Sequence, residues 1–144
     1  MKKTFVTLTL IAMGTAALSH GGVQDKNVMA RMEVMKTIGS QMKLIGKMAK
    51  GETAFDAAAV NAALTEIAAQ AALVPDSFET PATDPKSEAL PLIWEQFDDF
   101  TKLAGDLEST AANLAGTVQT DADLGPVMGQ MGATCKACHS TYRE

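Results

Sequence analysis

Residues 25–50 read DKNVMARMEVMKTIGSQMKLIGKMAK, and the spacing of their apolar and small side chains decides the fold class. Alternating steps of four and three lead along one stripe: Val28, Met32, Met35, Gly39, Met42, Gly46 and Ala49. Steps of this size place residues on one face of an α-helix. The stretch therefore predicts a long amphipathic helix that buries one face against other helices.

Three later segments show the same spacing, at about residues 56–74, 91–115 and 121–143. Their stripes are Val60, Leu64, Ile67, Ala71, Val74; Ile93, Phe97, Phe100, Ala104, Leu107, Ala111, Leu114; and Leu124, Met128, Met131, Cys135, Cys138, Tyr142. Three prolines among polar residues at 75–88 predict a surface crossing loop between the second and third helices. We expect one all-α domain over residues 20–144, an antiparallel up-down-up-down four-helix bundle with a left-handed twist.

The first residues have the pattern of a targeting segment. Lys2 and Lys3 precede an apolar run without acidic residues, and small residues stand near Ser19. This predicts a cleaved secretory signal peptide over residues 1–19, and hence export to the periplasm. An uncleaved membrane anchor is the alternative reading of the same run.

Removal of that segment would leave an acidic chain. The predicted signal peptide contains two of the 12 basic residues and none of the 17 acidic residues. The rest of the chain therefore has 10 basic and 17 acidic residues, a net charge of −7. This charge argues against nucleic acid and anionic lipid as partners, and it predicts redox partner proteins with basic patches. We expect no stable membrane insertion. The sequence does not decide whether the protein forms a homodimer.

Several glycines occupy faces that the stripes predict to be buried: Gly39, Gly46, Gly125, Gly129 and Gly132. A glycine inside a helix costs about 1 kcal/mol relative to alanine. The pattern predicts that something bulkier than a side chain fills the bundle.

Cys135-Lys136-Ala137-Cys138-His139 is a Cys-x-x-Cys-His sequence, which is typical of covalent haem attachment. Positions i, i+3 and i+4 share one helix face, so two thiols can reach the two vinyl groups of a haem while the imidazole reaches the iron. We expect one covalent haem c per chain. A dithiol oxidoreductase and a zinc site are the alternatives, but the first needs a βαβ context and the second needs more ligands.

Residues 135–143, CKACHSTYR, resemble the C-terminal signature of the class II c-type cytochromes, the cytochrome c′ family. The segments Met35–Gly39, Met48–Glu52 and Leu90–Trp94 are similar to the low-spin branch of that family. The resemblance implies that His139 is the proximal iron ligand and Met35 the distal one. It implies a periplasmic one-electron carrier that transforms no substrate.

The resemblance assigns further contacts to three residues. Arg31 would contact a haem propionate, Arg143 would lie on the proximal side, and Trp94 would border the haem edge. A solvated helix arginine, an arginine favoured by the helix dipole and a core tryptophan are the respective alternatives.

The distal ligand decides between two functions. Met32 and Met42 lie on the same stripe as Met35 and are the next candidates. If no methionine binds the iron, the resemblance implies a high-spin, five-coordinate protein that takes nitric oxide or carbon monoxide.

Overall fold

The computed structural model describes residues 22–144, so the predicted signal peptide at residues 1–19 lies outside them. Helices make up most of this part of the chain: α1 Lys26–Ala49, α2 Ala57–Ala72, α3 Val74–Phe78, α4 Leu92–Glu95, α5 Phe97–Leu114, the 3₁₀-helix η1 Asp121–Asp123 and α6 Leu124–Tyr142. Within residues 22–144 no helix is long and apolar enough to span a bilayer.

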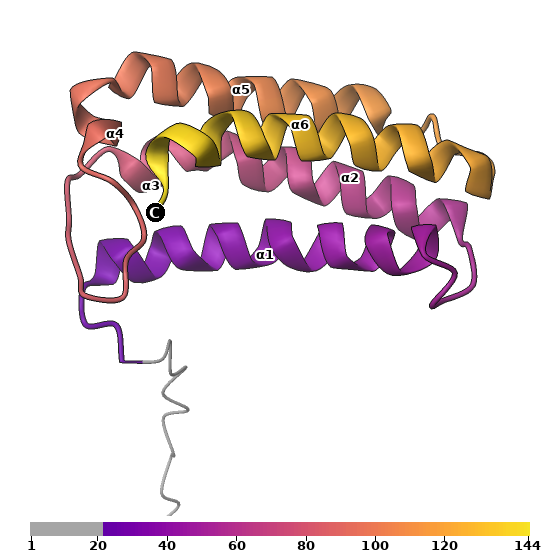
Figure 1. Ribbon diagram of the computed structural model, residues 1–144, viewed down its shortest axis with the longest axis horizontal. Helices are drawn as coiled ribbons and strands as arrows, with labels where there is room; N and C mark the ends of the chain where they lie inside the picture. Colours follow the sequence, from indigo (N-terminus) through magenta and orange to yellow (C-terminus); the bar gives the residue numbers. More distant parts are fainter. Residues whose placement is uncertain (1–21) are drawn as a thin grey trace, which may run out of the picture.

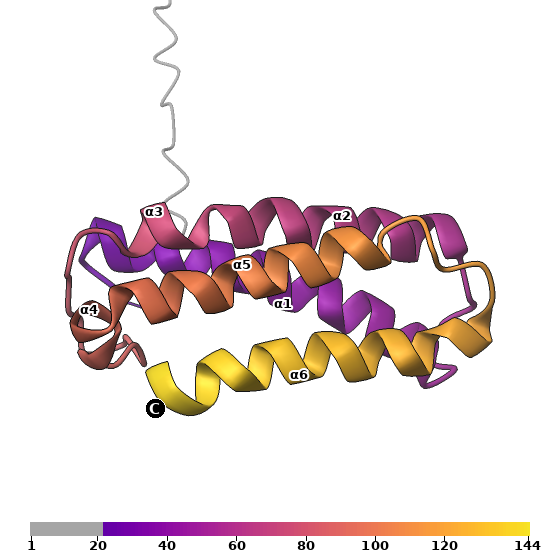
Figure 2. The ribbon, with the colours of Figure 1, turned by 90° about the horizontal axis from the view of Figure 1, so that it is seen from above.

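The four long helices α1, α2, α5 and α6 lie side by side and alternate in direction (Figures 1 and 2). α2 packs on both α1 and α5, and α6 packs on α5 and on α1. The described residues contain no strand, only an isolated antiparallel bridge between Ala89 and Arg143. This is an all-α four-helix bundle, which confirms the fold class predicted from the stripes.

Polar side chains set where the helices begin. The Asp25 carboxylate accepts from the backbone N–H groups of Asn27 and Val28 at 2.8 and 3.0 Å, and Asp56 accepts from Ala59 at 3.0 Å. Each bond satisfies a backbone donor that has no partner inside the helix. Thr120 and Asp123 form a reciprocal capping box before α6.

The core lies along the bundle axis and is built from aliphatic side chains of all four long helices. Its largest members include Ile45, Leu64, Ile67, Leu124 and Met131. Burying one such side chain contributes about 1.5–3 kcal/mol to folding. At one end, an aromatic group extends this core: Phe78 and Tyr142 pack on the Phe100 ring at 4.9 and 5.5 Å between centroids.

Three of the predicted helices differ from the structure. The fourth, expected from residue 121, has a 3₁₀-helix over Asp121–Asp123 before α6 begins at Leu124. The segment expected as one helix over 91–115 is broken at Gln96, whose φ of −129° and ψ of 43° are not helical. The Gln96 side chain accepts a hydrogen bond from the Tyr142 hydroxyl at 3.1 Å. Pro75, expected to begin the loop, lies in the first turn of α3, where a missing N–H costs no helical hydrogen bond.

The buried positions of α1 are shifted from the predicted stripe. Val28, Arg31, Ile38 and Ile45 are the buried residues of this helix. The middle of the predicted stripe, Met32, Met35, Gly39 and Met42, instead lines a cavity. The stripe therefore faces an interior space that the polypeptide itself does not fill.

The glycine prediction holds at two positions. Gly39 and Gly132 line the cavity, and a Cβ added at either would meet no atom within 4 Å. A Cβ at Gly46 would meet Met128 Cε at 3.7 Å, so this glycine packs on a side chain. Gly125 and Gly129 are exposed and do not line the cavity, so the prediction is wrong for both.

Candidate functional site

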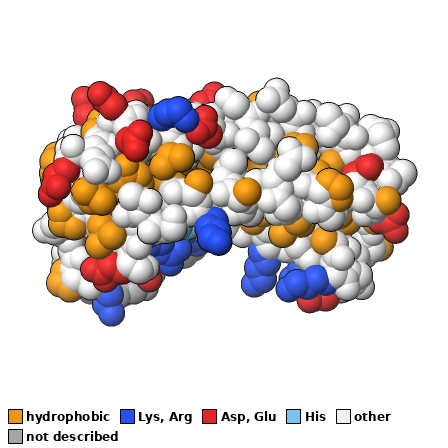
Figure 3. All heavy atoms as spheres, turned by 45° about the horizontal axis from the view of Figure 1, so that its top comes forward, with side chains coloured by type: hydrophobic (Ala, Val, Ile, Leu, Met, Phe, Trp, Pro, Cys, Tyr) orange, Lys and Arg blue, Asp and Glu red, His pale blue; other side chains and the backbone are white. Residues whose placement is uncertain are grey.

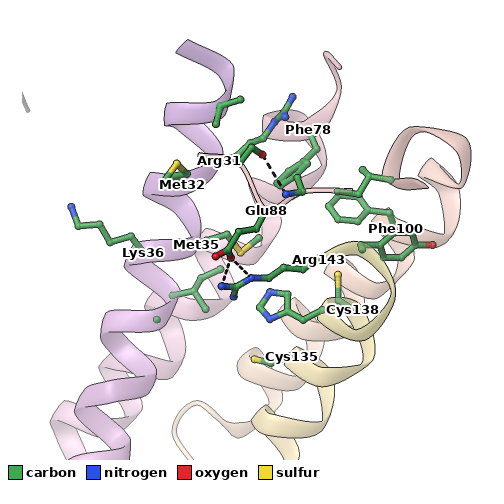
Figure 4. Close-up of a pocket in the computed structure, with 18 of the residues that line it drawn as sticks. Arg31, Met32, Met35, Lys36, Phe78, Glu88, Phe100, Cys135, Cys138 and Arg143 are labelled. Atoms are coloured by element: carbon green, nitrogen blue, oxygen red, sulfur yellow. Dashed lines mark hydrogen bonds and ion pairs between the residues drawn. The ribbon is translucent and has the colours of Figure 1, made fainter. Parts of the chain in front are cut away.

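A cavity of about 660 Å³ lies between α1, α6 and the segment of residues 79–91 that joins α3 to α4. α1 contributes Met32, Met35, Gly39 and Met42, and α6 contributes Cys135, Cys138 and His139. Residues 86–89 of the connecting segment complete the mouth. Figure 4 shows the methionines of α1 and the cysteines of α6 on opposite sides of this space.

α6 presents the haem-attachment motif to the cavity as one face. Cys135, Cys138 and His139 all line it, as expected for positions i, i+3 and i+4 of a helix. Both thiols are free and half-buried, and burial raises their pKa values. A dithiol oxidoreductase needs a thiol with a lowered pKa, so these surroundings argue against that alternative.

Among residues 22–144, no group of three or more His, Cys, Asp or Glu side chains is arranged to hold a metal ion alone. Burial, and then the charge of Arg143, lower the pKa of His139, while Glu88 opposes them. The neutral imidazole is the form that ligates metals, and these surroundings favour it.

The residues that line the cavity fit a covalent haem. Its volume falls in the range of about 300–1,000 Å³ typical of cofactor sites, and its walls are mainly apolar. Gly39 and Gly132 leave open space where other residues would place a side chain. The donor set of two thiols, an imidazole and an opposing thioether is a set of haem-binding groups.

Met35 faces this space from the helix opposite the motif. It lines the large cavity and also a smaller one of about 40 Å³, and both are shared with Cys135, Cys138 and His139. Met32 and Met42 line only the large cavity of the two. The fold thus brings Met35 into the same cavity as the complete motif, and its bond to the iron stays a prediction.

Arg31 serves a role that sequence reasoning missed. The residue is only 3% exposed, and its Nε and Nη1 donate to the carbonyl oxygens of Ser77 and Ala82, each at 3.0 Å. Its Nη2 donates to the carbonyl of Thr80. The guanidinium carbon lies 4.8 Å from the ring centroid of Phe78. Arg31 lines the cavity and ties the connecting segment to α1, and its propionate contact stays a prediction.

Trp94 lies behind Arg31 and is not among the residues that line the large cavity. Its ring centroid is 5.0 Å from the Arg31 guanidinium carbon, and its Nε1 donates to the carbonyl of Phe78 at 2.8 Å. The structure therefore shows Trp94 as a support for Arg31, and its predicted contact with the haem edge stays a prediction.

Arg143 and His139 both line the cavity, and Arg143 follows His139 by one helical turn. Its guanidinium forms an ion pair with Glu88 of the connecting segment (Figure 4). Nothing in the sequence pattern indicated Glu88, because the two partners come from segments 55 residues apart.

Known proteins with similar sequences and folds agree with this site. The family model described as cytochrome c′ matches residues 26–143. Cytochrome c-556 of Agrobacterium fabrum is 40% identical over 134 residues, which is 92% of this chain and 91% of that protein.

Solved structures give the same result. Cytochrome c′ of Rhodopseudomonas palustris is 34% identical with a TM-score of 0.76, over 84% of this chain and 98% of that one. Oxidised cytochrome c556 of the same organism is 29% identical with a TM-score of 0.76, over the same shares. The chain belongs to the cytochrome c′ family and is a class II c-type cytochrome that carries one covalent haem c.

Proposed function

We propose that this c-type cytochrome is a periplasmic one-electron carrier whose low-spin iron is ligated by His139 and Met35. The observation that supports the proposal is the position of these two residues: they come from α6 and α1 and line the same cavity. The relatives named cytochrome c-556 and cytochrome c556 add support, because their names describe them as c-type cytochromes.

Two residues of this chain would attach the haem, and two others would ligate its iron. Cys135 and Cys138 hold the haem, which supplies a one-electron iron couple when bound. His139 offers a neutral imidazole from one side. Met35 offers a thioether, a soft ligand that favours ferrous iron and raises the reduction potential.

The cavity walls support the same role. Apolar side chains such as Ile38, Ile93 and Phe100 line the cavity and would keep water from the iron. A dry, apolar shell controls the potential of a redox centre. Because His139 and Met35 would both hold the iron from rigid helices, neither side chain would need to move far when an electron is gained or lost, which suits electron transfer.

The proposal extends to location and partners. The predicted leader at residues 1–19 indicates export, and the chain would transfer electrons without transforming a substrate. The predicted net charge of −7 favours redox partners with basic patches. Acidic side chains gather at the left end of the face in Figure 3, and the first turns of α4 and α5 carry Glu95, Asp98 and Asp99.

The test replaces Met35 with alanine in the haem-loaded protein. The wild type should have low-spin spectra in both oxidation states, and Met35→Ala should become high-spin and bind carbon monoxide readily. Met32→Ala is the matched control, because Met32 lines the same wall of the cavity and loses the same atoms.

Two results would contradict the proposal. A high-spin wild type that takes carbon monoxide would favour the ligand-binding alternative. A Met32→Ala protein that becomes high-spin, while Met35→Ala stays low-spin, would move the ligand to Met32.

A further inference from the structure

An ion pair lies among the residues that line the cavity together with His139, the predicted proximal ligand. The Arg143 guanidinium contacts the Glu88 carboxylate, and Arg143, Glu88 and His139 all line the cavity. In Figure 4, Glu88 extends from the connecting segment and meets the Arg143 side chain that projects from the end of α6. The pair thus joins the segment over the mouth to the helix that carries the haem motif.

The backbone fixes the register of this pair. Leu90 N–H donates to the carbonyl of Tyr142 at 3.0 Å, and Glu144 N–H donates to the carbonyl of Glu88 at 3.0 Å. These bonds flank the antiparallel bridge between Ala89 and Arg143. Since they involve only main-chain atoms, they remain when either side chain is changed.

The pair has little to contribute to folding. The side chains of Arg143 and Glu88 are 49% and 58% exposed, and ion pairs at such positions contribute only about 0–1 kcal/mol to stability. Their position suggests an effect on the haem site instead. Arg143 follows His139 by one helical turn, and its backbone N–H donates to the His139 carbonyl at 3.3 Å.

A charge at this place acts on the iron rather than on the fold. Reduction lowers the positive charge of the iron by one. A nearby cation repels the reduced iron less than the oxidised iron, so it raises the reduction potential. A carboxylate paired with that cation offsets the effect. Lys36 and Lys86 are the other charged side chains besides Arg31 that line the cavity, and both residues are exposed.

We propose that Glu88 tunes the redox centre through its pair with Arg143: its carboxylate offsets the charge of the Arg143 guanidinium beside His139 and so keeps the reduction potential lower than Arg143 alone would set it. The proposal rests on the haem site at His139, but it does not depend on which residue is the distal ligand.

The experiment measures the midpoint potential of the haem-loaded wild type, Glu88→Gln, Arg143→Gln and the double variant at low ionic strength. Glu52→Gln is the matched control, because it removes the same charge in the turn between α1 and α2, at the other end of the bundle from the C-terminus (Figure 1). The absorption spectrum of each protein reports its ligation separately, so a failure of the Met35 proposal is distinguished from a failure of this one.

We expect Glu88→Gln to raise the potential by roughly a threefold change in the ratio of reduced to oxidised protein. For a one-electron couple, where tenfold is 59 mV, this is about 28 mV. Arg143→Gln should lower the potential, and the double variant, which lacks both charges, should lie between the two single variants and close to the wild type.

Two outcomes would overturn the proposal. A Glu88→Gln potential equal to that of Glu52→Gln would show that the carboxylate does not act on the redox centre. A double variant whose potential is no higher than that of Arg143→Gln would show that the Glu88 carboxylate does not offset a charge at the redox centre.

Discussion

Met35 on α1 and His139 on α6 line the same cavity, although they lie near opposite ends of the described chain. Each belongs to a helix whose neighbours are fixed by the bundle core, so the space between them does not depend on a flexible loop. Rigid helices are well suited to hold two ligands at a constant separation. This relationship supports an iron site in which both axial positions come from the bundle itself.

The three bonds of the Arg31 guanidinium to backbone carbonyls predict a large effect of its loss. Arg31→Met should lower the free energy of unfolding by about 2–4 kcal/mol, because three partly buried hydrogen bonds from a charged donor to backbone carbonyls of residues 77–82 would be lost. Arg31→Lys should recover only part of this, since an ammonium lacks the planar fork. Urea unfolding of the haem-loaded proteins measures both effects.

The matched control is Lys43→Met on the same helix, where the side chain is exposed. It should change the free energy of unfolding by less than about 0.5 kcal/mol. An Arg31→Met protein as stable as this control would contradict the anchoring role.

Asn61 on α2 ties down the loop that follows α5. Its side-chain oxygen accepts from the N–H of Gly116 at 2.8 Å, and its Nδ2 donates to the carbonyl of Val118 at 2.9 Å. Asn61→Ala should cost about 1–3 kcal/mol of stability, because it leaves these backbone groups without a partner. Asn113→Ala, at an exposed position of α5, should be neutral or slightly stabilising in the same thermal unfolding experiment.

The hydrogen bonds of the Asp84 carboxylate predict that the stability of the protein depends on pH. The backbone N–H groups of Gln24 and Lys86 donate to its carboxylate at 3.0 and 2.9 Å, and these bonds lower its pKa. A carboxylate whose pKa is lower in the folded state stabilises the protein above its unfolded pKa of about 3.9, and this contribution is lost as the pH falls through the folded value.

Asp84→Asn should therefore lose less stability than the wild type between about pH 5 and pH 2. Urea midpoints at several pH values measure the difference. Parallel pH profiles for the two proteins would show that the Asp84 bonds contribute nothing to acid stability.

The helices and the haem motif could be predicted because their signals are local. Steps of three and four identify a helix face, and Cys135, Cys138 and His139 lie within one and a half turns of α6. The stripe on α1 predicted the right helix but not the right burial, because periodicity does not distinguish a face that packs on side chains from one that borders a cavity.

The missed features all depend on partners far away in the chain. Arg31 reads as an ordinary helix arginine, since its acceptors are carbonyls 46–51 residues later. The break at Gln96 coincides with a hydrogen bond from Tyr142, which no local pattern in 91–115 contains. The pair of Glu88 with Arg143 forms only when the connecting segment crosses to the C-terminus.

The optical spectrum of the purified, haem-loaded wild type tests directly whether Met35 and His139 both ligate the iron. We predict a near-infrared band from methionine-to-iron charge transfer in the oxidised protein, and a reduced protein that does not readily bind carbon monoxide. High-spin bands in the oxidised protein, together with rapid uptake of carbon monoxide after reduction, would contradict this prediction.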